Sequence, residues 1–222
     1  MPVLDAAGMV VAIDGPVGSG KSTVARAVAE RLGLDHLETG AMYRAVAFAA
    51  IQTGLDPTRP GTTGADLARL AAAIDLEVGT RVFLHEIDVT EELRSPEVNR
   101  AASAVATHPS VRSELVRRQR QWAQLHGGGV IEGRDIGSVV FPDATLKVFL
   151  TASESERARR RQTDEDAGDL ARRDQSDSTR AVSPLVVAED AVIIDTTGRG
   201  IDDIVEQIVS HLEEALPNGS RP

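Results

Sequence analysis

The sequence predicts an α/β fold in which a parallel sheet of about five strands carries helices on both faces. The first observation is the run Met9–Asp14, which is short, rich in β-prone residues and followed by a glycine-rich loop. The second is the segment 22–32, whose apolar residues recur at helical spacing until Gly33 ends the pattern. Further apolar runs follow in the same order along the chain, and such alternation is typical of a parallel sheet.

The remaining elements of the predicted core repeat this strand-and-helix unit. A short run at 34–37 and a turn at Thr39-Gly40 precede a helical pattern at about 41–52, and a long helix is expected at 110–125. Three later strands are expected, most of them followed by a helical pattern, at 130–132, 145–150 and 191–195.

Some stretches depart from this alternation. Residues 57–64 are rich in proline, threonine and glycine, and residues 74–89 alternate like two or three small antiparallel strands that turn at Gly79. Residues 162–183 are dense in polar side chains, as in a mobile surface segment. We therefore expect a single domain with an inserted subdomain and a mobile lid. The expected boundaries are 1–222 for the domain, 9–55, 99–156 and 181–214 for its core, about 56–98 for the insertion and about 157–180 for the lid.

Composition excludes several classes of protein. The 222 residues carry a formal net charge of −10, which argues against a general binder of nucleic acid or of anionic membranes. The chain has no cysteine, so it holds no disulfide, thiolate zinc site or cysteine nucleophile. No apolar stretch approaches the roughly 20 residues that a membrane span needs, and no secretory signal precedes the first strand. We expect a cytoplasmic protein that acts as a monomer.

The glycine-rich loop is a phosphate-binding motif. Residues Gly15–Ser22 match G-x-x-x-x-G-K-[ST], with the required strand before and helix after. Glycines let backbone N–H groups converge on phosphate oxygens, Lys21 reaches the outer phosphates, and the Ser22 hydroxyl can ligate Mg²⁺. A plain glycine turn is the alternative, but it does not explain why one of only two lysines lies here among 22 arginines. The sequence thus predicts a P-loop NTPase-type fold that binds a nucleoside triphosphate and Mg²⁺.

A P-loop alone leaves a motor, a switch, a transporter ATPase and a kinase open. Several arginines lie in loops or at the ends of elements, where they can converge on a second polyanion: Arg44, Arg134, Arg157, Arg173 and Arg180. Other arginines nearby stay unassigned: Arg159, Arg160, Arg161 and Arg172. Phosphoryl transfer to a phosphate oxygen needs no strong general base, because the acceptor is already anionic. The pattern therefore favours a kinase that acts on a phosphorylated acceptor.

Four further segments carry a resemblance to a known family. They read LETGAMYRA at 37–45, RAASAVATHPSVR at 100–112, EGRDIGSVVFPDA at 132–144 and RRDQSDSTRAVSPL at 172–185. With the P-loop they resemble the bacterial-type cytidylate kinases, which are nucleoside monophosphate (NMP) kinases, and the resemblance runs from about Val10 to His211. It implies transfer of a phosphoryl group from ATP to CMP or dCMP in pyrimidine nucleotide metabolism, with the insertion as the NMP-binding subdomain.

The resemblance also implies roles for individual residues. ATP would be held by Gly15, Pro16, Val17, Gly18, Ser19, Gly20, Lys21, Ser22, Thr23 and Arg157. The acceptor would be held by Thr39, Tyr43, Arg44, Ser103, Arg112, Arg134, Asp135, Arg173, Asp177 and Arg180. Within these sets Lys21, Arg134 and Arg173 would be catalytic. Arg44 and Arg134 would take the acceptor phosphate.

Base recognition is expected from Ser103, Arg112 and Asp135. Cytosine presents an amino donor beside two acceptors, so a carboxylate that faces the amine and an arginine that faces the acceptors match that edge. Uracil would place its O4 against the Asp135 carboxylate, acceptor to acceptor, and would be excluded. Asp177 and Arg180 resemble a ribose contact, and Arg173 a phosphate clamp on the lid.

The chain departs from the family pattern in three places. Glu38 stands where aspartate is usual, Glu86-Ile87 replaces a glycine-containing turn, and the lid segment from Gln162 is short. Two other functions stay open at this stage. One is a kinase of the same architecture that acts on UMP, AMP or a non-nucleotide acceptor, and the other is a nucleotide-binding switch without an acceptor.

Overall fold

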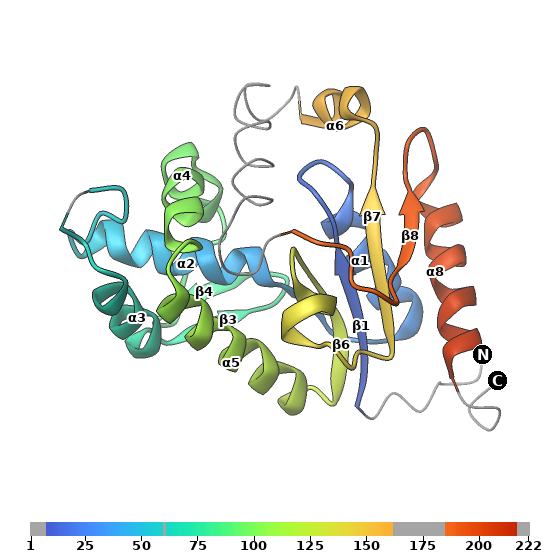
Figure 1. Cartoon of the computed structure of the whole chain (residues 1–222). Coiled ribbons are helices and arrows are strands. Elements are labelled where there is room, and N and C mark those ends of the chain that lie inside the picture. The colour runs from blue at the N-terminus through green and yellow to red at the C-terminus, as the bar shows by residue number, and fades with distance from the viewer. Residues whose placement is uncertain (1–7, 60, 162–184, 217–222) are drawn as a thin grey trace. The chain divides into compact units, whose positions relative to one another are not determined.

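A five-stranded parallel sheet with the strand order β2-β6-β1-β7-β8 forms the centre of one part of the molecule (Figure 1). Its strands are β1 (Met9–Asp14), β2 (His36–Glu38), β6 (Gly128–Gly133), β7 (Leu146–Thr151) and β8 (Val192–Asp195). Every residue of β1 and β6 is buried, as expected for strands inside a parallel sheet. The predicted α/β fold with a five-stranded parallel sheet is confirmed.

The computed structural model describes residues 8–59, 61–161 and 185–216. These residues fall into two units, of which the first comprises 8–37, 122–161 and 185–216 and the second comprises 38–59 and 61–121. The predicted insertion at 56–98 lies inside the second unit, and its boundaries stay a prediction. Within the described residues, no helix combines the length and the apolar composition that crossing a membrane requires.

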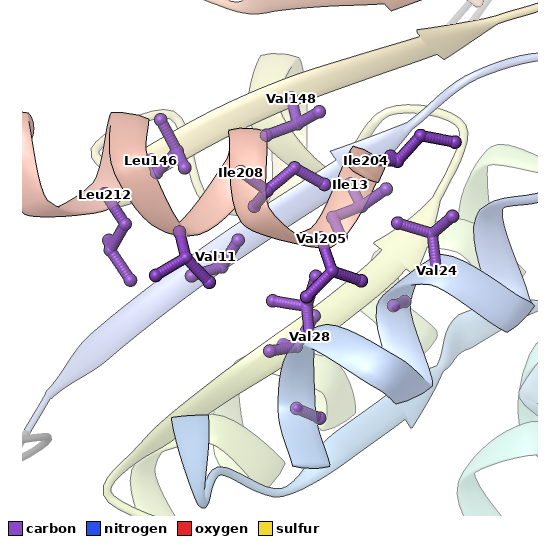
Figure 2. Close-up of a cluster of buried hydrophobic side chains, with 14 of the residues drawn as sticks. Val11, Ile13, Val24, Val28, Leu146, Val148, Ile204, Val205, Ile208 and Leu212 are labelled. Carbon is purple, nitrogen blue, oxygen red and sulfur yellow. The ribbon is translucent and has the colours of Figure 1, made fainter. Parts of the chain in front are cut away.

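Two helices pack on one face of the large sheet. Helix α1 (Lys21–Leu32) follows the P-loop, and helix α8 (Ile201–Ala215) follows β8. Figure 2 shows their apolar side chains meeting those of β1 and β7. Ile208 and Leu212 of α8 are fully buried in this cluster. Because α1 starts directly after the P-loop, this core fixes the loop against the end of β1.

Register in the sheet aligns the carboxyl ends of three strands. Asp14, the last residue of β1, pairs with Gly133 of β6 and with Phe149 of β7. In open α/β sheets, ligands bind outside the carboxyl ends of the strands. The P-loop follows β1 at this edge of the sheet. The segment with Arg134 and Asp135 follows β6 at the same edge.

The second unit contains helices and a small antiparallel sheet. Its helices are α2 (Thr39–Gln52), α3 (Gly64–Ala73), α4 (Pro96–Val105) and most of α5 (Pro109–Leu125), with a 3-10 turn at Glu92–Arg94. Its strands β3 (Leu76–Val78), β4 (Val82–Leu84) and β5 (Ile87–Asp88) pair antiparallel in that order. The predicted small antiparallel strands are confirmed, whereas helices α3 and α4 had no sequence prediction. Both have clear start signals, a capping box between Thr63 and Asp66 and a Ser95 N-cap before Pro96.

One turn of this small sheet is strained. His85 and Glu86, which connect β4 to β5, have φ values of 48° and 65°. Residues other than glycine adopt this left-handed region at a cost, because Cβ approaches the following carbonyl oxygen. The departure noted at Glu86-Ile87 therefore leaves the hairpin in place but in a conformation that suits glycine better.

Candidate nucleotide-binding site

Glycines shape the P-loop between β1 and α1. Gly18 and Gly20 have φ values of +79° and +87°, and Gly20 is the residue before the first turn of α1. At Gly15, φ is +150°, and a Cβ would lie 2.1 Å from the carbonyl oxygen of Leu150. Only glycine permits this backbone path, which leaves the loop at the positive end of a helix dipole.

The interior of the loop fits the phosphates of a nucleotide. Ser19 is fully buried, and within the described part of the chain its Oγ has no hydrogen-bond partner. Lys21 is also buried, and its Nζ donates to the carbonyl oxygen of Pro16 at 2.8 Å. A buried hydroxyl without a partner and a buried ammonium in one glycine loop match an anionic oxygen ligand.

Glu132 joins this loop from the neighbouring strand. It lies at the carboxyl end of β6, opposite Ile13 of β1, and it is 4% exposed. Ser22 Oγ donates to Glu132 Oε1 at 2.7 Å. Ser22 was predicted to bind the metal, whereas Glu132 had no predicted role, although its position as an acidic residue at the end of a strand was the available signal.

As metal ligands, the oxygens of Ser22 and Glu132 suit Mg²⁺, which takes its other ligands from phosphate and water. They do not suit a metal ion whose ligands are all protein side chains. Among the described residues, no group of three or more His, Asp or Glu side chains could hold an ion. Mg²⁺ in kinases is usually bound through one or two protein oxygens, substrate phosphates and water. Ser22 and Glu132 therefore supply what such a site needs from the protein.

Asp14 is a second acidic residue without a sequence prediction. Its Oδ1 accepts the N–H of Ile136 and its Oδ2 accepts the N–H of Gly137, both at 2.8 Å. Burial raises the pKa of Asp14 to about 6, the two backbone hydrogen bonds oppose that rise, Asp135 adds to it, and Lys21 also opposes it. Asp14 thus ties the end of β1 to the turn that carries Asp135.

Arg134 and Asp135 directly follow β6. Asp135 is 6% exposed, and its carbonyl oxygen accepts the N–H groups of Val139 and Val140 in the π-helical segment Ile136–Val140. Arg134 is half-buried and donates from Nη1 to the carbonyl oxygen of Gly133 at 3.3 Å. The structure places both residues at the same sheet edge as the P-loop.

Helix α6 (Glu154–Arg161) lies against the P-loop. Arg157 Nη1 donates to the carbonyl oxygen of Val17 at 3.2 Å. A Cβ at Gly18 would lie 3.0 Å from the Cβ of Arg157. The structure therefore brings Arg157 to the loop that it was predicted to serve, through contacts with the loop's backbone.

In the second unit, helix α2 carries Thr39, Tyr43 and Arg44 along its first turns. Thr39 is buried and Arg44 forms an ion pair with Glu38. The Glu38 side chain, where the family usually has aspartate, is thus engaged with the arginine expected to take the acceptor phosphate.

Two residues expected to contact the base lie on other helices of this unit. Arg112 of α5 lies with its guanidinium carbon 5.6 Å from the centre of the Tyr43 ring, close enough for a cation–π contact. It is only 4% exposed, although an arginine-rich helix is normally a solvated face. Ser103 of α4 donates to the carbonyl oxygen of Asn99 at 3.4 Å. The structure brings Tyr43 and Arg112 together.

The remaining predicted site residues lie outside the described residues: Arg173, Asp177 and Arg180. The first unit thus holds the P-loop, Arg134, Asp135 and Arg157, and the second holds the residues of α2, Ser103 and Arg112. That these two groups act on one pair of substrates stays a prediction.

Sequence comparison points to one family. The family model for cytidylate kinase matches residues 11–214. A cytidylate kinase of Pelotomaculum thermopropionicum is 49% identical over 221 residues, which cover 91% of this chain and 95% of the relative. A cytidylate kinase of Desulfitobacterium hafniense (strain Y51) is 45% identical over 220 residues, which cover 94% of both chains.

Several of the curated relatives with high similarity are longer than this chain. They include a bifunctional pantoate ligase/cytidylate kinase of Trichormus variabilis, which is 47% identical over 93% of this chain. The chain spans 42% of the length of that relative.

Solved structures share the fold at low sequence identity. An uncharacterized protein from Eubacterium ventriosum has a TM-score of 0.52 at 15% identity, over 92% of this chain and 98% of its own. A protein from Thermus thermophilus has a TM-score of 0.50 at 19% identity, over 95% of this chain and 98% of its own. These likenesses concern the fold alone. The family model, the long high-identity matches and an intact P-loop lead to one conclusion: the chain belongs to the cytidylate kinase family.

Proposed function

We propose that this protein is an ATP-dependent cytidylate kinase, which converts ATP and CMP or dCMP into ADP and CDP or dCDP. The observation that carries the proposal is the family match over residues 11–214, which includes the complete P-loop and the segment 132–144. We also propose that it acts in the cytoplasm as a monomer.

The donor side of the reaction rests on the P-loop. Its N–H groups and the Lys21 ammonium would bind the phosphates of ATP, and Arg157 would add positive charge from α6. Ser22 and Glu132 would hold Mg²⁺, which supplies charge neutralisation between the outer phosphates. Because Ser22 Oγ donates its hydrogen to Glu132, the lone pairs of this oxygen would be left to bind the ion.

The acceptor side needs cations and a base reader. Arg44 and Arg134 would bind the phosphate of CMP, and Arg173 would act on the transferred group. An oxygen of the CMP phosphate attacks the γ-phosphorus of ATP, the bond from that phosphorus to the bridging oxygen breaks, and ADP leaves with the bonding electrons. Positioning and neutralisation of charge account for catalysis, so no histidine base is needed.

Selectivity for cytosine would come from Asp135. Its carboxylate would accept the cytosine amino group, and Arg112 would donate to the ring acceptors. Two features of the structure support this assignment. Asp135 is nearly buried, and its turn is fixed by the bonds from Ile136 and Gly137 to Asp14. A buried carboxylate on a fixed turn discriminates strongly, because the O4 of uracil would face it acceptor to acceptor.

Replacement of Asp135 by asparagine tests this assignment. The amide can donate to O4 of uracil, so we expect the ratio of kcat/KM for CMP over UMP to fall by about 100-fold or more. Asp143→Asn is the matched control, since Asp143 is an exposed carboxylate in the same segment. An unchanged ratio in a folded Asp135→Asn protein would refute the role of Asp135. Binding of ATP without formation of any diphosphate product would instead favour the switch.

A further inference from the structure

Three consecutive carbonyl groups of the P-loop accept hydrogen bonds from side chains outside the loop. The acceptor–donor pairs are Val17 O with Arg157 Nη1 at 3.2 Å, Gly18 O with Arg160 Nη1 at 3.4 Å and Ser19 O with Thr196 Oγ1 at 3.0 Å. The donors come from α6 and from the residue after β8. Two elements that are far from the loop in the sequence therefore bind it through its carbonyl oxygens.

Thr196 and Arg160 form one unit within this set. Arg160 Nη1 donates to Thr196 Oγ1 at 2.9 Å, and Arg160 Nη2 donates to the carbonyl oxygen of Thr196 at 2.8 Å. Thr196 is 1% exposed, and its own N–H donates to the carbonyl oxygen of Thr151 at the end of β7. Its hydroxyl oxygen lies 3.0 Å from Ser19 O and 3.1 Å from Thr151 O. The single hydroxyl hydrogen is thus shared between a carbonyl group of the loop and one at the end of β7.

Glu156 anchors Arg160 on α6. Arg160 Nε donates to Glu156 Oε1 at 2.9 Å, and Arg159 donates to both oxygens of the same carboxylate. Hydrogen bonds from Arg159, and then from Arg160, lower the pKa of Glu156 to about 2. The carboxylate is therefore ionised near neutral pH, and its hydrogen bond to Nε holds Arg160 in the direction of the loop.

Close packing adds a second constraint on the same loop. A Cβ at Gly20 would lie 3.4 Å from Arg160 Nη1, and a Cβ at Gly18 would lie 3.0 Å from the backbone oxygen of Arg157. Helix α6 thus lies against the loop at both glycines. A side chain at Gly18 would press on the backbone of α6, whereas a Cβ at Gly20 would only touch the end of the Arg160 side chain.

We propose that Arg160 and Thr196 are positioning residues for ATP, because they fix the peptide planes of the P-loop. In a planar trans peptide the N–H points opposite to the C=O of the same unit. A donor on Ser19 O therefore sets the direction of the Gly20 N–H, polarises it and strengthens it as a donor to phosphate. A donor on Gly18 O sets the direction of the Ser19 N–H, which donates to the carbonyl oxygen of Pro16 at 3.4 Å and so holds the shape of the loop.

This inference rests on the proposed role of the loop in binding ATP, and it deepens that role. It assigns a function to Arg160, which the sequence alone left undetermined among its neighbours. It also separates Arg160 from Arg159. Both contact Glu156, but within the described residues Arg159 makes no hydrogen bond to the P-loop, and its side chain is 69% exposed.

The test compares binding of Mg²⁺-ATP to variants of the full chain by titration calorimetry. We expect Thr196→Val and Arg160→Gln each to raise the Kd for ATP by about 3- to 10-fold, as for the loss of one or two net hydrogen bonds. Thr196→Ser keeps the hydroxyl and should stay within about twofold of the wild type, and so should Arg159→Gln, the matched control. In steady-state assays the KM for ATP should rise while the KM for CMP stays constant.

Several results would overturn the inference. One is a Kd for ATP within twofold of the wild type for both Thr196→Val and Arg160→Gln, with circular dichroism showing that they are folded. Another is an equal loss in Arg159→Gln and Arg160→Gln. If Arg160→Gln does not fold, Arg160→Lys replaces it, because lysine keeps the charge but cannot reach Thr196 and Gly18 together.

The readout also separates this inference from the proposed function. A wild type that binds ATP but makes no CDP contradicts the proposed function and leaves the binding comparison intact. A wild type that binds no ATP contradicts both.

Discussion

Replacement of Asp14 by asparagine should change how the stability of the protein depends on pH. The carboxyl of Asp14 is 4% exposed, accepts two backbone N–H groups and lies near the charges of Asp135 and Lys21. Burial is the largest cause that raises its pKa from 3.8 to about 6. Since each pKa unit corresponds to about 1.4 kcal/mol, the folded state disfavours the ionised form by roughly 3 kcal/mol.

The sign of the effect follows from proton binding. Between pH 3.8 and about pH 6 the folded protein keeps the proton on Asp14 while the unfolded chain loses it. The contribution of Asp14 to the free energy of unfolding therefore falls as the pH rises through this range, and it is constant above it. The free energy of unfolding of the wild type minus that of Asp14→Asn should fall by about 2.5 kcal/mol between pH 4 and pH 7.

Urea unfolding of both proteins at several pH values measures this difference. Other titrating groups are common to the two chains and largely cancel. A difference for Asp14→Asn that does not change with pH would show that the pKa of Asp14 is the same in the folded and unfolded protein, and the electrostatic reasoning would be wrong.

Two further predictions concern stability. Glu86→Gly should raise the free energy of unfolding by about 0.5–1 kcal/mol, because glycine relieves the positive φ of 65° in an exposed turn. Glu77→Gly, in strand β3, should lower it; a urea midpoint that falls for both would contradict the strain at Glu86. Leu212→Ala should cost about 2–5 kcal/mol, because Leu212 is fully buried between α8, α1 and the sheet. Leu125→Ala, at a side chain that is 76% exposed, should cost under about 0.5 kcal/mol, and equal losses would argue against this core.

Local patterns were enough to predict the P-loop and the strands. The motif at Gly15–Ser22 needs only short-range spacing, and its strand and helix are contiguous with it. The five-stranded parallel sheet followed from the repeated strand-and-helix order. Such features are encoded within windows of about 20 residues, where periodicity is a sufficient guide.

Residues whose role depends on sheet order could not be identified in this way. Glu132 is more than 100 positions from Ser22, and only the pairing of β1 with β6 brings the two together. Asp14 looks like an ordinary residue at the end of a strand until Ile136 and Gly137 are seen to donate to it. Arg160 stands among several arginines of one short helix, and only its direction toward Thr196 distinguishes it.

The central claim is that this chain transfers a phosphoryl group from ATP to CMP or dCMP. Formation of ADP, measured in a coupled assay with CMP, dCMP, UMP and AMP offered separately as acceptors, tests it most directly. We predict rapid ADP formation with CMP or dCMP, equal amounts of the corresponding diphosphate, and kcat/KM values for UMP and AMP that are lower by orders of magnitude. Preference for UMP or AMP, or ADP formation that does not depend on any acceptor, would contradict the claim.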